Sequence, residues 1–339
     1  MLIFLYGNNI KEILDKENQA LFCAEEEIID QDLPVLVKKF KNKASKKHYV
    51  KTVILNYREL EVKEDLHPNI LACCSRGGIS GCKIKEDVII IHVHGGGFIG
   101  GNTFMEENIL REWSSKLKVP VTGIDYRVAP GHKYPSSLDD VYQAYMWLIE
   151  NSAVCLGVKP KKIIMTGDSA GGTLILTLTF LLITLNKYLN KSIKLPDLLI
   201  PFYPCCNTSL ENMSLSLPLC YDDLLLNYEN LKYISESYRG TYKNNLDPFL
   251  NPQTANEKLL KHLPPTVFFI GSQDPLRDDT VRLMHNLSKI KRASFKCYEF
   301  KYYPHAFLNS SNREIKEITD EIFFYEVRNF LKEHDWEYK

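Results

Sequence analysis

The chain has 339 residues, its 42 Lys and Arg balance 42 Asp and Glu, and 45% of its residues are hydrophobic. These proportions belong to an ordinary globular protein and exclude a collagen, a coiled coil or a disordered chain. A formal net charge of zero argues against binding to nucleic acid through an overall basic field. We therefore expect a small-molecule partner and no nucleic acid.

Nine cysteines, an odd number with no C-x-x-C spacing, fit neither a disulfide framework nor a zinc ribbon. The apolar residues 1–6 have no basic flank before them and no small-residue cleavage site soon after, so we predict no signal peptide. The uncharged run 169–186 opens with Ser-Ala-Gly-Gly and contains several threonines, which favours a buried helix over a membrane span. We predict a cytoplasmic protein without a transmembrane segment.

Short runs of β-branched and apolar residues alternate with helical patterns from residue 88 onward. Continuous apolar runs of this length predict strands buried on both faces, and the alternation predicts parallel strands joined by helices. The predicted strands are 88–93, 121–125, 163–166, 198–203, 266–271 and 295–300, and the predicted helices are 106–118, 138–151, 170–186, 279–288 and 314–333. We therefore predict the α/β class, with residues 1–339 forming one domain around a mostly parallel sheet covered by helices.

Two segments, about 1–47 and 205–252, do not follow this alternation. Insertions near the carboxyl ends of parallel strands usually shape the entrance to a site, so we predict that both contribute to a helical cap. The second segment contains six leucines that could contact an acyl chain or a sterol, or pack as ordinary core: Leu215, Leu217, Leu219, Leu224, Leu225 and Leu226.

The strongest motif is Gly167-Asp-Ser-Ala-Gly171, which has the form G-x-S-x-G and joins a predicted strand to a predicted helix. Glycines on both sides of the serine allow a tight, strained turn that exposes the hydroxyl above the N-terminus of the helix. Alone the pattern is weak, because short Gly/Ser turns arise by chance. Its position between strand and helix predicts that Ser169 is a nucleophile.

A glycine run, His94-Gly-Gly-Gly-Phe98, follows the predicted strand 88–93. Three glycines allow backbone N–H groups to approach an oxyanion with no Cβ in the way. The alternatives are a flexible loop and a Rossmann-type phosphate cradle. The cradle is disfavoured because no helix-opening pattern with the usual acidic residue follows.

A nucleophilic serine needs a base, and α/β hydrolases order their residues as serine, acid and histidine along the chain. Four histidines follow Ser169: His262, His285, His305 and His334. His305 comes just after the last predicted strand, where a loop can return it over the strand ends. We predict that His305 is the base.

The acid should follow the preceding strand, as Asp274 does. Asp278 or Asp279 could hold the histidine instead, and all three could simply cap the next helix. The carboxylate would fix the imidazole tautomer and stabilise the imidazolium without accepting the proton.

Two other pairs of residues could carry chemistry. His92 and His94 lie on the same side of a predicted strand, but no further ligands follow at metal spacing, so we do not expect zinc. Cys205 and Cys206 have no basic neighbourhood and are interpreted as small buried side chains rather than reactive thiols.

Several motifs in order over residues 88–308 resemble the hormone-sensitive lipase family of α/β hydrolases, which includes microbial carboxylesterases and arylacetamide deacetylase. They are His94-Gly-Gly-Gly-Phe98, Asp125-Tyr-Arg-Val-Ala-Pro130, Gly167-Asp-Ser-Ala-Gly-Gly172, Asp274-Pro-Leu276 and His305-Ala-Phe307. The resemblance implies an α/β-hydrolase fold, a triad of Ser169, Asp274 and His305, and an oxyanion hole formed by the N–H groups of Gly96, Gly97 and Ala170.

The segment 247–252 and the pattern at Asp279 are most similar to the catalytic region of hormone-sensitive lipase. From this similarity we expect that the large N-terminal regulatory domain of that lipase is missing here. Two positions depart from the family pattern. Gly131 stands where the family usually has Glu, and Ala306 stands where it usually has Gly, which could crowd the histidine loop by one methyl group. Neither change removes a member of the triad or a donor to the oxyanion.

The sequence thus predicts a carboxylic ester hydrolase, an esterase or lipase that works through an acyl-enzyme and needs no metal or organic cofactor. An amidase or deacetylase would use the same triad. A receptor on the same fold is disfavoured because His305 is present. The predicted partner is a small-molecule or lipid ester, and the lipase resemblance extends to peripheral lipid contact and a lipid-droplet location. The oligomeric state is left open.

Overall fold

The computed structural model describes residues 2–7, 47–55, 87–155, 159–189, 192–211 and 214–333. In these residues eight strands form one sheet in the order β1-β2-β4-β3-β5-β6-β7-β8. The strands are β1 (Leu2–Gly7), β2 (Lys47–Leu55), β3 (Val88–Val93), β4 (Val121–Asp125), β5 (Lys162–Asp168), β6 (Leu198–Phe202), β7 (Thr266–Gln273) and β8 (Phe295–Pro304). From β4 to β8 all neighbours are parallel, whereas β2 pairs antiparallel with β1 and β4. The predicted α/β class and its six strands are confirmed.

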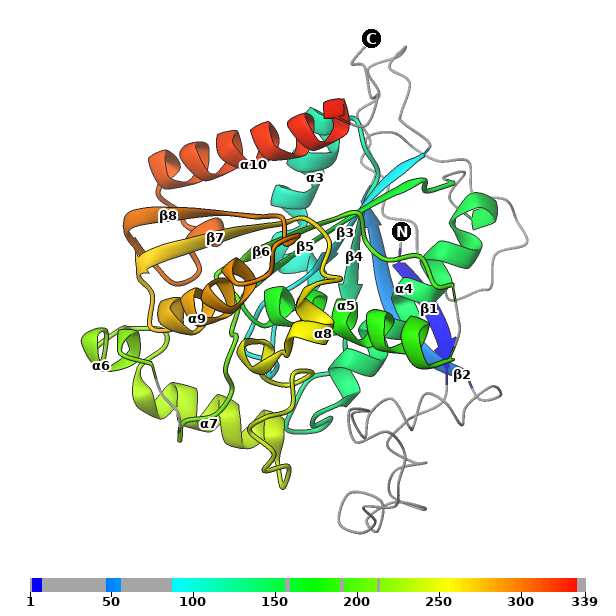
Figure 1. The fold of residues 1–339 in the computed structure, drawn as a ribbon. Coiled ribbons are helices and arrows are strands. Elements are labelled where there is room, and N and C mark those ends of the chain that lie inside the picture. The colour runs from blue at the N-terminus through cyan, green and yellow to red at the C-terminus, as the bar shows by residue number, and fades with distance from the viewer. Residues whose placement is uncertain are drawn as a thin grey trace.

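Helices cover both faces of the sheet (Figure 1). On one face lie α3 (Glu107–Leu117) and α10 (Arg313–Glu333). The other face carries α4 (Ser136–Cys155), α5 (Ala170–Leu189), α8 (Glu257–Leu260) and α9 (Arg277–Ser288). Each face has its own buried apolar cluster, because strands in the middle of a parallel sheet point side chains alternately to both sides. The five predicted helices are therefore confirmed.

Helix α5 is the one described helix that is long and apolar enough to cross a membrane, over Ala170–Lys187. However, 89% of this stretch is buried inside the protein, against β3, β5, β6 and α4. The expectation that it forms a buried core helix is confirmed.

The predicted cap boundaries need one correction. Leu2–Gly7 do not belong to a cap, because they form β1 at the edge of the main sheet, paired with β2. Neither β1 nor β2 was predicted, because the alternation of strand and helix patterns was traced only from residue 88 onward. Residues 8–46 lie outside the described part of the chain. The second cap segment contains α6 (Ser216–Leu219) and α7 (Tyr228–Arg239) and ends at η2 (Pro252–Thr254).

Trp113 joins three elements on the α3 face. Its fully buried ring stacks on Phe323 of α10, with ring centroids 4.1 Å apart, and lies 5.9 Å from Phe202 of β6. Its Nε1–H donates to Asp320 Oδ1 at 3.3 Å. The side chain therefore fills the space between α3, α10 and the sheet.

We expect Trp113→Ala to lower the free energy of unfolding by about 3–5 kcal/mol, because the cavity left behind cannot close and Asp320 loses a donor. Urea unfolding followed by circular dichroism measures this loss. Tyr325→Ala, at a position on α10 that is 58% exposed, is the control and should cost less than about 1 kcal/mol. Equal losses in the two variants would contradict this packing.

Candidate active site

Ser169 occupies a sharp turn between β5 and α5. Its φ of 51° lies in the left-handed region, which is strained for a residue with a side chain. The turn is packed so closely on β3 that a Cβ on Gly171 would lie 1.8 Å from the carbonyl oxygen of Val93. Only glycine fits there, as the strand-turn-helix motif requires. The Ser169 N–H donates to the Phe202 carbonyl at 2.9 Å, which anchors the turn to β6.

The structure brings His305 and Asp274 to this turn. Asp274 follows β7 and His305 follows β8, and because these strands are parallel neighbours their carboxyl ends lie together. His305 Nδ1 lies 2.8 Å from Asp274 Oδ2, and His305 Nε2 lies 2.9 Å from Ser169 Oγ. All three residues are buried, with exposures of 9% or less. The sequence-predicted acid, base and serine thus form one continuous chain of hydrogen bonds.

This chain of contacts defines the tautomer of His305. An ionised Asp274 can only accept, so His305 Nδ1 carries the proton and Nε2 is left to accept the proton of Ser169. The other oxygen, Asp274 Oδ1, accepts from the Leu276 N–H at 2.8 Å and fixes the carboxylate. The Tyr203 ring packs edge-on against the imidazole at 4.8 Å.

Ala306, one of the two departures from the family pattern, has φ 61° and ψ 26°. This left-handed conformation explains why glycine is the usual residue, since alanine pays a steric cost of about 1 kcal/mol there. At Gly131, by contrast, the nearest atom to an added Cβ is the Val128 carbonyl oxygen at 3.8 Å, so a side chain would fit.

The alternative acids make other contacts. Asp278 Oδ2 accepts from the Ser216 N–H at 3.0 Å, and its Oδ1 pairs with Arg277. Asp279 lies 3.6 Å from Arg282. Both carboxylates therefore hold the start of α9 and its neighbours rather than His305.

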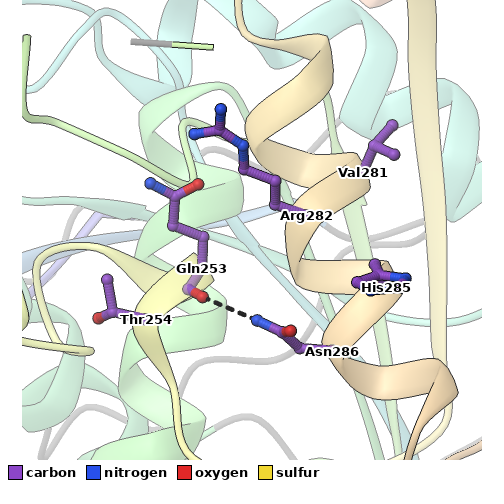
Figure 2. A pocket seen from close by; sticks show the side chains of 6 residues that line it. All are labelled: Gln253, Thr254, Val281, Arg282, His285 and Asn286. Carbon is purple, nitrogen blue, oxygen red and sulfur yellow. Dashed lines mark hydrogen bonds between the residues drawn. The ribbon is translucent and has the colours of Figure 1, made fainter. Parts of the chain in front are cut away.

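The alternative histidines also lie elsewhere. Figure 2 shows His285 on α9, in the lining of a separate pocket of about 490 Å³ where the Asn286 side chain donates to the Gln253 carbonyl. His262 is exposed after α8, and His334 lies outside the described residues.

The glycine run lies beside the serine. Gly96 has φ 105°, and a Cβ there would lie 2.3 Å from the Gly100 carbonyl oxygen, so the loop conformation requires glycine. Gly96 and Gly97 line the same cavity as Ser169 and His305. Ala170 is the first residue of α5, where backbone N–H groups have no partner within the helix.

The cavity over Ser169 has a volume of about 700 Å³. Its walls are mostly apolar and come from the glycine loop, η1 (Thr103–Glu106), the start of α3, the loop after His305 and the segment 225–234. The large apolar lining residues are Ile99, Met105, Ile109, Leu225, Leu226, Tyr233, Ile234 and Leu308. Two of the six leucines singled out in the sequence thus reach the cavity. Leu217 is buried outside its lining, and Leu215, Leu219 and Leu224 are exposed.

One group of side chains in the described residues has the composition of a metal site, and it is not the His92–His94 pair. His92 lies with Glu106 and Asp168, and one ligand atom from each lies within 4.8 Å of the others. His94 instead stacks on Tyr126 at 4.2 Å and hydrogen bonds through Nδ1 to the Gly95 carbonyl. Three ligands are fewer than a structural zinc site uses. Sequence reasoning missed Glu106, which no motif marks.

Cys205 and Cys206 are both buried. Burial raises the pKa of Cys205 to about 12 and that of Cys206 well above its usual value, so both thiols stay protonated. Their interpretation as small buried side chains agrees with the structure.

Comparison with known proteins shows the family to which this chain belongs. A family model described as an alpha/beta hydrolase fold matches residues 90–309. The chain belongs to the α/β-hydrolase family. This hydrolase is 30% identical to an esterase of Acinetobacter venetianus over 230 residues, which are 67% of the chain and 70% of the relative. It is 31% identical to mouse hormone-sensitive lipase over 157 residues, 46% of the chain but only 20% of that lipase.

Solved structures agree with the fold of this hydrolase. Carboxyl esterase 2 from Tuber melanosporum superposes with a TM-score of 0.68 at 20% identity, covering 84% of this chain and 83% of the esterase. An arylesterase superposes with a TM-score of 0.59 at 27% identity, covering 71% and 75%. The predicted α/β-hydrolase fold and the resemblance to the hormone-sensitive lipase family are confirmed.

Proposed function

We propose that the protein is a serine carboxylic-ester hydrolase with Ser169 as nucleophile, His305 as general base and acid, and Asp274 as the group that orients the histidine. The observation that carries this proposal is the hydrogen-bond chain of 2.8 and 2.9 Å from Asp274 through His305 to Ser169, at the base of an apolar cavity. The esterases and lipases among its relatives support an ester as the substrate.

In the proposed reaction the Ser169 oxygen attacks the ester carbonyl carbon while His305 Nε2 takes the hydroxyl proton. The N–H groups of Gly96, Gly97 and Ala170 would donate to the oxyanion that forms. As the carbon–oxygen bond of the leaving alcohol breaks, His305 returns the proton to that alcohol. Water then attacks the acyl-enzyme with His305 again as base, which releases the acid and restores Ser169.

The apolar walls of the cavity favour binding of an apolar acyl group of the substrate. We infer a single domain in which the segment 205–252 forms the cap, since its residues 225–234 supply one wall above the serine. Gly97 lies directly under this wall, because an added Cβ would be 3.0 Å from Ile234 Cδ1.

The test is hydrolysis of p-nitrophenyl esters from acetate to palmitate, with p-nitroacetanilide as the amide counterpart of the acetate. We expect ester turnover with an initial burst of one p-nitrophenol per enzyme wherever deacylation is slow. Reaction with a p-nitrophenyl phosphonate should leave one adduct, located at Ser169 by peptide mass spectrometry. No turnover of any ester by the folded protein, or an adduct on another residue, would overturn the proposal. Faster cleavage of the anilide would identify an amidase.

A further inference from the structure

Three buried ionisable side chains lie behind Ser169 and take no part in the proposed reaction. His92 comes from β3, Glu106 ends η1 and Asp168 ends β5, and their exposures are 1%, 7% and 4%. His92 Nε2 lies 2.7 Å from Glu106 Oε2 and 3.7 Å from Asp168 Oδ1, while His92 Nδ1 lies 2.8 Å from Thr166 Oγ1. Burying ionisable groups costs desolvation free energy, which pairing offsets only in part. A cluster of three therefore suggests a role beyond stability.

The cluster connects the segments that the reaction depends on. Asp168 directly precedes Ser169, and its carboxylate packs on the glycine loop so closely that a Cβ on Gly95 would lie 2.4 Å from Asp168 Oδ2. Glu106 ends the segment that continues from this loop, and both Glu106 and Asp168 are among the residues that line the cavity. Any shift of the Asp168 side chain would therefore move the serine turn relative to the glycine loop.

The charges of the cluster depend on one another. Burial opposes protonation of His92, but the nearby Glu106 and Asp168 outweigh it and raise the pKa to about 9, so His92 is a cation at neutral pH. Burial would raise the pKa of Glu106, but attraction to His92 and hydrogen bonds hold it below its usual value. Burial and the like charge of Glu106 raise the pKa of Asp168 to about 6, although His92 offsets part of the increase.

We propose that Glu106 and His92 are positioning residues that hold the Asp168 carboxyl, and with it the Ser169 turn, in register with the glycine loop. The inference rests on the proposed function, because the register matters only if Ser169 attacks and the glycine loop binds the oxyanion. A misplacement of about 1 Å at such a site costs roughly 100-fold in rate.

Among the described residues, the other ionisable groups near Asp168 are His94, Tyr126 and Tyr203. Burial lowers the pKa of His94, which directly follows β3. Tyr126, after β4, and Tyr203, after β6, both have their pKa raised well above the usual value by burial. Besides burial, two charged neighbours act on the pKa of Asp168: Glu106 raises it and His92 lowers it.

The two partners of Asp168 should consequently shift the pH dependence in opposite directions. Glu106→Gln removes a negative charge, so the midpoint of the acid limb of kcat should move to lower pH by at least about 0.5 unit. His92→Gln removes the cation, so the midpoint should move to higher pH by a similar amount. In both variants we expect kcat on p-nitrophenyl butyrate to fall about 10-fold or more, with KM changed by less than about twofold.

The matched control is Glu107→Gln, the same substitution one residue along, where the carboxylate pairs with Arg111. It should leave both kcat and the midpoint unchanged.

A second test uses Asp168→Asn, which removes the titrating carboxyl. In that background Glu106→Gln should produce no further shift, and this comparison remains decisive if His92→Gln fails to fold.

Merely structural roles would lower the thermal midpoint, and a direct effect of the removed charges on His305 would persist in the Asp168→Asn background. Acid limbs that coincide with the wild type, or that shift the same way in Glu106→Gln and His92→Gln, would overturn the inference. Failure of the proposed function has a different signature, because Ser169→Ala would then hydrolyse the ester as fast as the wild type.

Discussion

Replacement of Ser169 by alanine is expected to lower kcat for p-nitrophenyl butyrate by at least about 10⁴-fold. The variant keeps the turn but has no oxygen to attack the carbonyl, so only water activated by His305 and the oxyanion donors remain. Because Ser169 lies at φ 51° and alanine tolerates this conformation about equally, we expect a thermal midpoint within a few degrees of the wild type.

Steady-state kinetics on both proteins, with circular dichroism of each, check this expectation. Ser288→Ala is the matched control, because this exposed serine ends α9 and donates to the His285 carbonyl at 2.8 Å. Its kcat should equal that of the wild type. Residual activity above about 1% in a folded Ser169→Ala protein would show that another group is the nucleophile.

Asp274→Asn is expected to lower kcat by about 10⁴-fold with little change in KM. An amide in place of the carboxylate can turn its NH₂ group toward His305 Nδ1, which lies 2.8 Å from Asp274 Oδ2 in the wild type. The imidazole then favours the tautomer with its proton on Nε2, which faces Ser169 and cannot accept the hydroxyl proton. If the amide oxygen faces Nδ1 instead, the hydrogen bond between them is weaker because the oxygen carries no full charge.

The control for this prediction is Asp278→Asn, since Asp278 is the neighbouring acid that contacts Ser216 instead of His305. We expect its kcat to change by less than about threefold. Stopped-flow measurement of the acylation step for both variants separates loss of the base from slower product release. A drop of only a few-fold in Asp274→Asn would assign the orienting role to a different group.

Most of the sheet could be predicted because strands buried on both faces appear as unbroken apolar runs, such as residues 88–93. The positions of Ser169, Asp274 and His305 follow from the same rule, since each comes at or just after the carboxyl end of a predicted strand. What failed was the antiparallel edge formed by β1 and β2, because the predicted alternation began only at residue 88.

The surroundings of the site were beyond sequence reasoning. Leu224 and Leu226 are two residues apart in one leucine run, yet the first is 98% exposed and the second 6%. No periodicity in such a short loop predicts which side chain turns inward. The meeting of His92 with Glu106 is equally invisible, because it depends on how η1 folds back over β3, a property of tertiary packing rather than of local pattern.

The three residues of the proposed triad do not come from equally protected parts of the molecule. Ser169 follows β5, which has strands on both sides, whereas His305 follows β8, the last strand of the sheet, whose residues are mostly exposed. Local opening costs least at such edges, so β8 can separate from β7 while β5 and α5 keep their native contacts. We therefore expect His305 to leave its position in the proposed triad more readily than Ser169 does.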